Sequence, residues 1–170
     1  MKNVTLAKTV GIILLALCFA SSADAGGVKN KANAVIAGIL LEIPNYIILP
    51  NERRQLCVIE NAGLSYAAQK LNQRKKIYQH IFLKNRLHNL NSCDVIHVSD
   101  KAWARKALTA PATSNKLIIS DYHAFVDEGG TIAVLDNNGV IGIELNISAA
   151  KRLGISINPD LIEVSVRVIQ

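Results

Sequence analysis

The sequence lacks the short motifs by which several common enzyme and metal-site classes can be identified. Its 170 residues contain no G-x-S-x-G nucleophile elbow, no H-E-x-x-H zinc motif, no paired C-x-x-C motif and no glycine-rich phosphate loop. Each motif places a nucleophile, a metal ligand or a phosphate-binding amide at a fixed position, so its absence removes the sequence support for that chemistry. We therefore predict a protein that is not an enzyme and that needs no metal or cofactor.

Aromatic residues are also scarce, at 5% of the chain, which is too few to line the basic clusters. The formal net charge is +6, and the clusters are Arg53-Arg54, residues 74–76, and Lys101 with Arg105-Lys106. A surface that binds single-stranded nucleic acid needs aromatic side chains on which bases can stack. The clusters therefore predict a solvated face and no nucleic-acid partner, while attraction to an acidic partner or a lipid surface stays open.

Long apolar runs are nearly absent, and the clearest one lies at the N-terminus. Lys2 and Lys8 precede the apolar residues 10–20, and Ala23-Asp24-Ala25 forms an A-x-A cleavage pattern. The run is about half the roughly 20 residues that a membrane-spanning helix needs. We predict a secretory signal peptide over residues 1–25, cleaved after Ala25, and a single exported domain over residues 26–170. A retained membrane anchor is the alternative.

Of the three cysteines, Cys18 lies within the predicted signal, so the exported domain keeps Cys57 and Cys93. An even pair in an oxidising compartment predicts a disulfide. Both residues lie at the beginning of apolar strands, and parallel neighbouring strands would bring those beginnings together. A free, nucleophilic Cys93 is the alternative.

The stretch NSCDVIHVSD around Cys93 also contains His97, which raises the possibility of a metal or catalytic site. On a strand, Cys93 and His97 would share a face but lie roughly 13 Å apart, too far for one metal ion. A catalytic pair of His97 with Ser99 or Ser120 stays an open alternative to a packed histidine.

The pattern of apolar residues predicts alternating helices and strands. Residues 29–43 are expected to form an amphipathic helix whose apolar stripe is Ala32, Val35, Ile39 and Ile43, and which ends at Pro44. Further helices are expected at 64–71 and 101–108, with Trp103 facing the core. Strands are expected at 55–60, 76–84, 94–98 and 116–120.

The C-terminal third is expected to contain a β-hairpin. Asn138-Gly139 separates two apolar runs, 131–135 and 140–145, and this dipeptide is a strong hairpin signal. Asn146 should cap a helix over 147–153 that ends at a left-handed Gly154. After Pro159 a helix is expected, with a strand over the alternating residues 164–169 as the alternative. Together these elements predict an α/β fold, a layered sandwich with a mixed, partly parallel sheet and a C-terminal antiparallel hairpin.

Several stretches resemble the YfiR family of periplasmic regulators. They are LCVIE at 56–60, SCDVIHVSD at 92–100, and residues 120–162, which contain GG, the Asn-Gly hairpin, E-x-N and then AAKRLGIS. The resemblance covers most of the exported domain and follows a secretion signal and an N-terminal helix. Where the family commonly has a tryptophan before the proline that ends this helix, the sequence has Glu42-Ile43-Pro44.

The resemblance implies a non-enzymatic regulator that binds the periplasmic domain of an inner-membrane diguanylate cyclase and restrains it, which lowers cyclic di-GMP signalling and biofilm formation. It also implies an OmpA-like outer-membrane lipoprotein as a second partner, a homodimer, and the family's disulfide at Cys57 and Cys93.

Two sets of residues are candidates for contact with a partner or ligand. Leu40 and Leu41, if they lie off the core face of the first helix, would form an apolar patch for a protein partner. Tyr122, His123 and Phe125 in the loop after strand 116–120 would line a pocket in the alternative function, a periplasmic small-molecule-sensing or binding protein without a cyclase partner. A hydrolase that uses His97 or His123 as a base is the third hypothesis.

Overall fold

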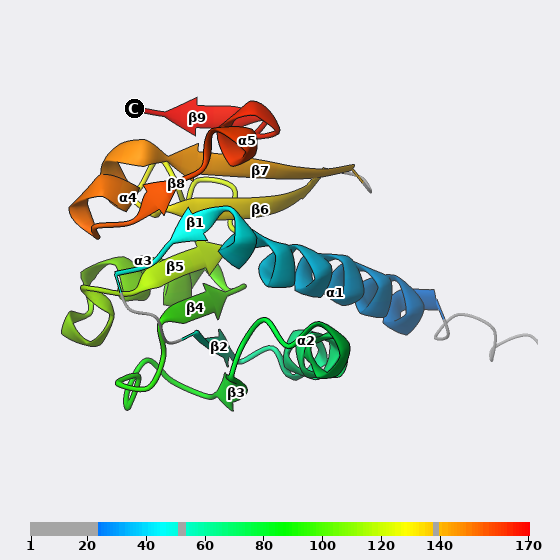
Figure 1. The fold of residues 1–170 in the computed structure, drawn as a ribbon. Coiled ribbons are helices and arrows are strands. Elements are labelled where there is room, and N and C mark those ends of the chain that lie inside the picture. The colour runs from blue at the N-terminus through cyan, green and yellow to red at the C-terminus, as the bar shows by residue number, and fades with distance from the viewer. Residues whose placement is uncertain (1–23, 51–53, 138–139) are drawn as a thin grey trace, which may run out of the picture.

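A seven-stranded mixed β-sheet forms the centre of the protein and carries helices on both faces (Figure 1). The structure, a computed structural model, describes residues 24–50, 54–137 and 140–170. The helices are α1 (Asp24–Glu42), α2 (Ala62–Lys75), α3 (Lys101–Thr109), α4 (Ile147–Arg152) and α5 (Pro159–Glu163), with 3-10 turns η1 (Ile43–Asn45) and η2 (Pro111–Thr113). The strands are β1 (Ile47–Ile48), β2 (Gln55–Ile59), β3 (His80–Lys84), β4 (Val95–Val98), β5 (Leu117–Ser120), β6 (Ile132–Asn137), β7 (Val140–Asn146), β8 (Ser156–Ile157) and β9 (Arg167–Ile169).

The strand order in the main sheet is β3-β2-β4-β5-β6-β7-β9. All neighbouring pairs are parallel except β6 and β7, which form an antiparallel hairpin. The short strands β1 and β8 pair separately as an antiparallel ribbon. This confirms the predicted α/β layered fold with a partly parallel sheet and a C-terminal hairpin.

Alternate side chains of each strand enter two separate apolar cores. In β2, Leu56 and Val58 face the core under α1 and α2, whereas Cys57 and Ile59 face the core under α3. Because successive residues of a strand point to opposite faces, a strand with helices on both sides must be apolar throughout. This explains why the central strands are continuous apolar runs in the sequence.

Polar caps set the beginnings of the helices. The side-chain oxygen of Asn61 accepts a hydrogen bond from the Leu64 amide at 3.0 Å, and that of Asn146 accepts one from the Ala149 amide at 2.8 Å. Each bond satisfies an amide that has no partner within its own helix. The predicted Asn146 cap and the left-handed Gly154, whose φ is 67°, are confirmed.

The strand predicted over 76–84 begins only at His80, because α2 is longer than expected. α2 ends at Lys75, and the next residue, Lys76, adopts a left-handed conformation with φ 53°. The side chain of Asn72 then accepts hydrogen bonds from the amides of Ile77 and Tyr78. The predicted terminal helix is also shorter than expected, since α5 gives way to β9.

Two predictions fall on parts of the chain outside the described residues. They are most of the signal peptide and the hairpin turn residues Asn138 and Gly139, although the strands that flank this turn pair as expected, with Asn137 opposite Val140. Over the described ranges, no helix is both long and apolar enough to cross a membrane.

Candidate functional site

The loop that follows β5 does not bring its three candidate residues together. Phe125 is fully buried in the core under α3, Tyr122 is half-buried, and His123 is exposed. Gly130 lies so close to the Phe125 ring that a Cβ atom there would be 2.3 Å from a ring carbon. Phe125 is therefore a packing residue, and it is not available for contact with a ligand or partner.

Tyr122 is held against α3 by charged side chains. Its ring lies between the Lys101 ammonium, 5.2 Å from the ring centroid, and the Arg105 guanidinium, 5.7 Å from it. Its hydroxyl donates a hydrogen bond to Glu128 at 2.9 Å, and Arg105 Nε donates to the same carboxylate at 2.8 Å. The hydrogen bonds from Arg105 lower the pKa of Glu128 to about 2. The loop is thus tied down by an ion pair and its ring contacts.

The expected contact patch at Leu40 and Leu41 is wrong, because both side chains are fully buried beneath α1. The core face of α1 consists of Ile36, Ala37, Leu40 and Leu41. Of the predicted stripe, Ile43 is buried in the same core and Ile39 packs against it. Val35, in that stripe, keeps 47% of its surface exposed. The helix has apolar residues on two faces, and the condition for a patch at Leu40 and Leu41, a position off the core face, is not met.

A disulfide joins Cys57 to Cys93, with 5.7 Å between the Cα atoms. Cys57 lies in the middle of β2 opposite Ile96, and Cys93 lies two residues before β4. The bridge predicted from the sequence is present, but it connects a strand to a turn over the sheet face instead of joining two strand beginnings. Both sulfurs are buried in the core under α3, so neither cysteine is a free thiol.

Polar side chains gather at the carboxyl ends of β2, β4 and β5. Asn61 Nδ2 donates to Ser99 Oγ at 3.1 Å and to Asn33 Oδ1 of α1 at 3.4 Å. Burial raises the pKa of the nearby Asp121 to about 6, although a hydrogen bond with Ser99 acts in the opposite direction. The chain turns to opposite sides of the sheet after β2 and β4, and such switch points often hold ligands in α/β folds.

His97 is fully buried on β4, and neither ring nitrogen has a hydrogen-bond partner among the described residues. Burial lowers its pKa to about 3, so the ring is neutral near pH 7. Ser99 is bonded to Asn61, and Ser120 donates to the Val98 carbonyl at 2.7 Å. The catalytic pair that the sequence left open is therefore not formed, and within the described ranges no three His, Cys, Asp or Glu side chains are grouped to hold a metal ion.

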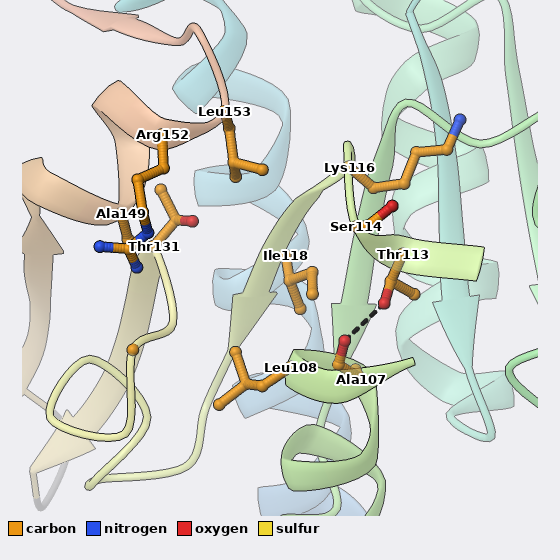
Figure 2. Close-up of a pocket in the computed structure, with 11 residues that line it drawn as sticks. Ala107, Leu108, Thr113, Ser114, Lys116, Ile118, Thr131, Ala149, Arg152 and Leu153 are labelled. Atoms are coloured by element: carbon orange, nitrogen blue, oxygen red, sulfur yellow. Dashed lines mark hydrogen bonds between the residues drawn. The ribbon is translucent and has the colours of Figure 1, made fainter. Parts of the chain in front are cut away.

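A pocket of about 280 Å³ opens between η2, the end of α3, and α4 (Figure 2). Its floor is apolar, with Leu108, Ile118 and Leu153, and its rim carries Lys116 and Arg152. Figure 2 shows the Lys116 side chain extending away from the other lining residues. None of the predicted ligand residues lines this pocket, although Gly129, at the end of the loop 121–130, does.

An apolar groove of about 320 Å³ lies between α1, Tyr46, β7 and α5. The α1 side is lined by Val35, Gly38 and Ile39, and the α5 side by Leu161 and Val164. Val164 is 68% exposed, and Tyr46 is 37% exposed. The sequence signal for this groove was the predicted apolar stripe of α1, of which Val35, Ile39 and Ile43 line it. We call this surface the α1–α5 groove.

The sequence matches the model of the YfiR/HmsC-like family over residues 33–166. No curated protein matches it significantly. The matched range contains the disulfide, the buried residues of both cores and every residue that lines the α1–α5 groove.

Two solved structures share the fold. One is a conserved domain protein from Vibrio cholerae, with a TM-score of 0.56 and 12% identity over 80% of this chain and 60% of that one. The other is the ABC domain in complex with L-Trp from Streptococcus pneumoniae, with a TM-score of 0.54 and 14% identity over 81% of this chain and 60% of that one. The chain thus spans about 60% of the length of each structure, and at this identity the likeness concerns the fold alone.

Proposed function

We propose that this protein, which belongs to the YfiR/HmsC-like family, is a periplasmic regulator that works by protein contact and restrains an inner-membrane diguanylate cyclase. Less restraint would raise cyclic di-GMP output and biofilm formation. The proposal includes export through a cleaved signal over residues 1–25, a single regulatory domain over 26–170, and no catalytic activity of its own. A homodimer and an OmpA-like outer-membrane lipoprotein as a second partner belong to the same proposal.

The α1–α5 groove is the observation that carries the proposal. Apolar side chains that stay exposed along a groove are typical of surfaces that bind another protein. Helix α1 supplies one wall while its opposite face packs on the sheet, so a partner can bind without disturbing the core. The buried His97, whose ring nitrogens have no partner among the described residues, supports a non-catalytic role, because a neutral and fully buried ring has no access to a substrate in solvent.

The test uses single substitutions in the groove and a matched control outside it. Val35→Asp and Val164→Asp place a carboxylate in the groove, which should weaken binding to the cyclase's periplasmic domain at least tenfold, because burying an unpaired charge is unfavourable. Val140→Asp is the control, since Val140 is the same residue type, is 71% exposed and does not line the groove. The readouts are affinity for the purified periplasmic domain and cyclic di-GMP in a deletion strain.

The deletion strain should have raised cyclic di-GMP, which the wild-type protein and Val140→Asp restore and the two groove variants do not. Unchanged cyclic di-GMP after deletion would contradict the proposed function itself. Full restoration by the groove variants would instead show that the contact surface lies elsewhere on the protein.

A second candidate function, small-molecule binding without a cyclase partner, is favoured by the pocket in Figure 2. Its apolar floor and the Arg152 guanidinium on its rim suit a small carboxylate with an apolar body, and one protein with a similar fold is in complex with L-Trp. A ligand that binds only the folded state must raise the melting temperature. Amino acids that leave the melting temperature unchanged, in wild type and Arg152→Ala alike, would rule out this class of ligand.

A further inference from the structure

The charges of the protein are separated along the sequence in a way that the net charge hides. Residues 61–93 contain six Lys and Arg residues and no Asp or Glu. Of these six, only Lys75 forms an ion pair among the described residues, with Glu42 of α1. The five other cations are Lys70, Arg74, Lys76, Lys84 and Arg86. We call α2, β3 and the loop 85–92 the basic edge.

The fold brings this segment together at one end of the molecule. β3 is the outermost strand of the main sheet, and α2 packs beside it, as Figure 1 shows at the lower end of the view. Gln69 of α2 donates a hydrogen bond to the Ile81 carbonyl of β3 at 3.0 Å, which ties the helix to the strand. The cations that follow one another in sequence therefore lie at the same end of the molecule.

The opposite edge of the sheet differs in its charges. Residues 121–163 contain seven of the 13 acidic residues of the chain, and α5 and β9 lie at the upper end of Figure 1. Several of these carboxylates are neutralised locally: Asp127 and Glu144 pair with Arg167, and Glu128 pairs with Arg105. The basic edge has no comparable internal neutralisation, so its positive potential extends into the solvent.

We propose that the basic edge binds the surface of a phospholipid bilayer that contains anionic headgroups. Each Lys or Arg near such a surface strengthens binding roughly fivefold, and mobile headgroups can follow any arrangement of cations. A specific acidic protein would be better matched by forked arginine pairs, whereas three of the five free cations are flexible lysines. The inference requires no cyclase and goes beyond the proposed function.

Two exposed side chains on the same edge fit the interface of a bilayer. Tyr66 of α2 is 67% exposed and Leu83 of β3 is 42% exposed. Tyrosine is enriched at the level of lipid headgroups, because its ring is apolar and its hydroxyl is polar. Bound through the basic edge, the protein would hold the α5 wall of the α1–α5 groove away from the bilayer, accessible to a domain that projects from the membrane.

The test is co-sedimentation of the exported, oxidised protein with vesicles of phosphatidylcholine alone or with one third phosphatidylglycerol. The wild-type protein should bind only the phosphatidylglycerol vesicles, and binding should fall steeply as salt is added. The edge variant is Lys70→Gln, Arg74→Gln and Lys76→Gln. The control variant is Lys106→Gln, Lys151→Gln and Arg152→Gln, which removes the same residue types and the same net charge from other surfaces.

The edge variant should bind at least tenfold more weakly than wild type, and the control variant should stay within about twofold. Equal losses in both variants would overturn the proposal, because binding would then follow net charge alone. Equal binding to phosphatidylcholine would overturn it as well, and so would polyglutamate binding that is tighter than vesicle binding and lost in the edge variant, which would point to an acidic protein. If the edge variant does not fold, two other measurements test the proposal. Tyr66→Ser should weaken binding to the phosphatidylglycerol vesicles, and wild-type binding that does not fall with salt would overturn the proposal.

Discussion

The two outer edges of the main sheet are built differently, although one chain forms both. The edge with α2 and β3 is polar and basic, and five of its cations have no ion-pair partner among the described residues. The edge with β7, β9 and α5 exposes Val164 and Val166, and Arg167 of β9 pairs there with Glu144 and with Asp127. One edge offers charge and the other apolar surface.

This difference suggests that two distinct partners can bind at the same time. Charge acts over about 8 to 10 Å in physiological salt and tolerates imprecise geometry, whereas apolar contact needs close fit. A bilayer and a folded protein domain have these two sets of requirements. The disulfide belongs to the comparison, because the whole basic edge lies in the loop that it closes between Cys57 and Cys93.

The largest expected effect comes from removing the disulfide. The bridge closes a loop with a sequence separation of 36 residues, so Cys57→Ala with Cys93→Ala should lower the free energy of unfolding by about 3 to 4 kcal/mol. Urea unfolding monitored by circular dichroism measures this change. Because the closed loop contains α2 and β3, hydrogen exchange should accelerate most at the basic edge.

The hairpin β6–β7 provides the internal control for that experiment. Its amides lie outside the closed loop and should change only as much as the global stability does. Equal acceleration in the hairpin and in β2–β4 would mean that the two edges open as one unit, and the comparison between them would fail.

A smaller effect, on the pH dependence of the free energy of unfolding, is expected from His97. This residue lies in β4, between the two edges, so the effect does not distinguish them. Its pKa is about 3 when folded and 6.5 when unfolded, so the unfolded state takes up the proton first as the pH falls. Stability is thus complete above pH 6.5 and decreases towards pH 3. Relative to wild type, His97→Met should gain about 2 kcal/mol between pH 6.5 and pH 5, measured by urea unfolding.

Asp121 provides the control of opposite sign and smaller size. Burial raises its pKa to about 6, above the ordinary value of 3.8, so the folded state takes up the proton first and stability increases as the pH falls through this window. Asp121→Asn should remove that increase. Stability curves of His97→Met and wild type that run parallel with pH would contradict this prediction, because the protonated ring would then have found a partner in the folded protein.

Much of the secondary structure could be predicted because local signals were strong. Three patterns each indicate a single local structure: the apolar runs of the central strands, the Asn-Gly hairpin and the Asn146 cap. The conformation of Lys76 could not be predicted from such signals. Its left-handed conformation depends on the Asn72 side chain and two amides beyond it, which no periodicity reveals.

The candidate site was harder to predict, and α1 shows why. Its sequence is apolar on two faces, so periodicity allows either face to pack on the sheet. The stripe that we predicted contains Val35, which stays exposed, and Ile43, which is buried, whereas Leu40, a contact residue only if it lay off the core face, is fully buried. The loop residues Tyr122 and Phe125 were assigned to a ligand for a similar reason, since aromatic residues in a loop can cover a core or line a pocket.

The sequence by itself determined the elements that depend on neighbouring residues: the buried strands, the helix caps, the hairpin and the single pair of cysteines available for a bridge. Only the tertiary structure decided which face of α1 is buried, how His97 is sealed from solvent, and that the segment without carboxylates forms one edge. These outcomes depend on strand order and on the packing of helices that are distant in sequence. The free energy of such packing comes from contacts between two surfaces, and a pattern within one segment describes only one of them.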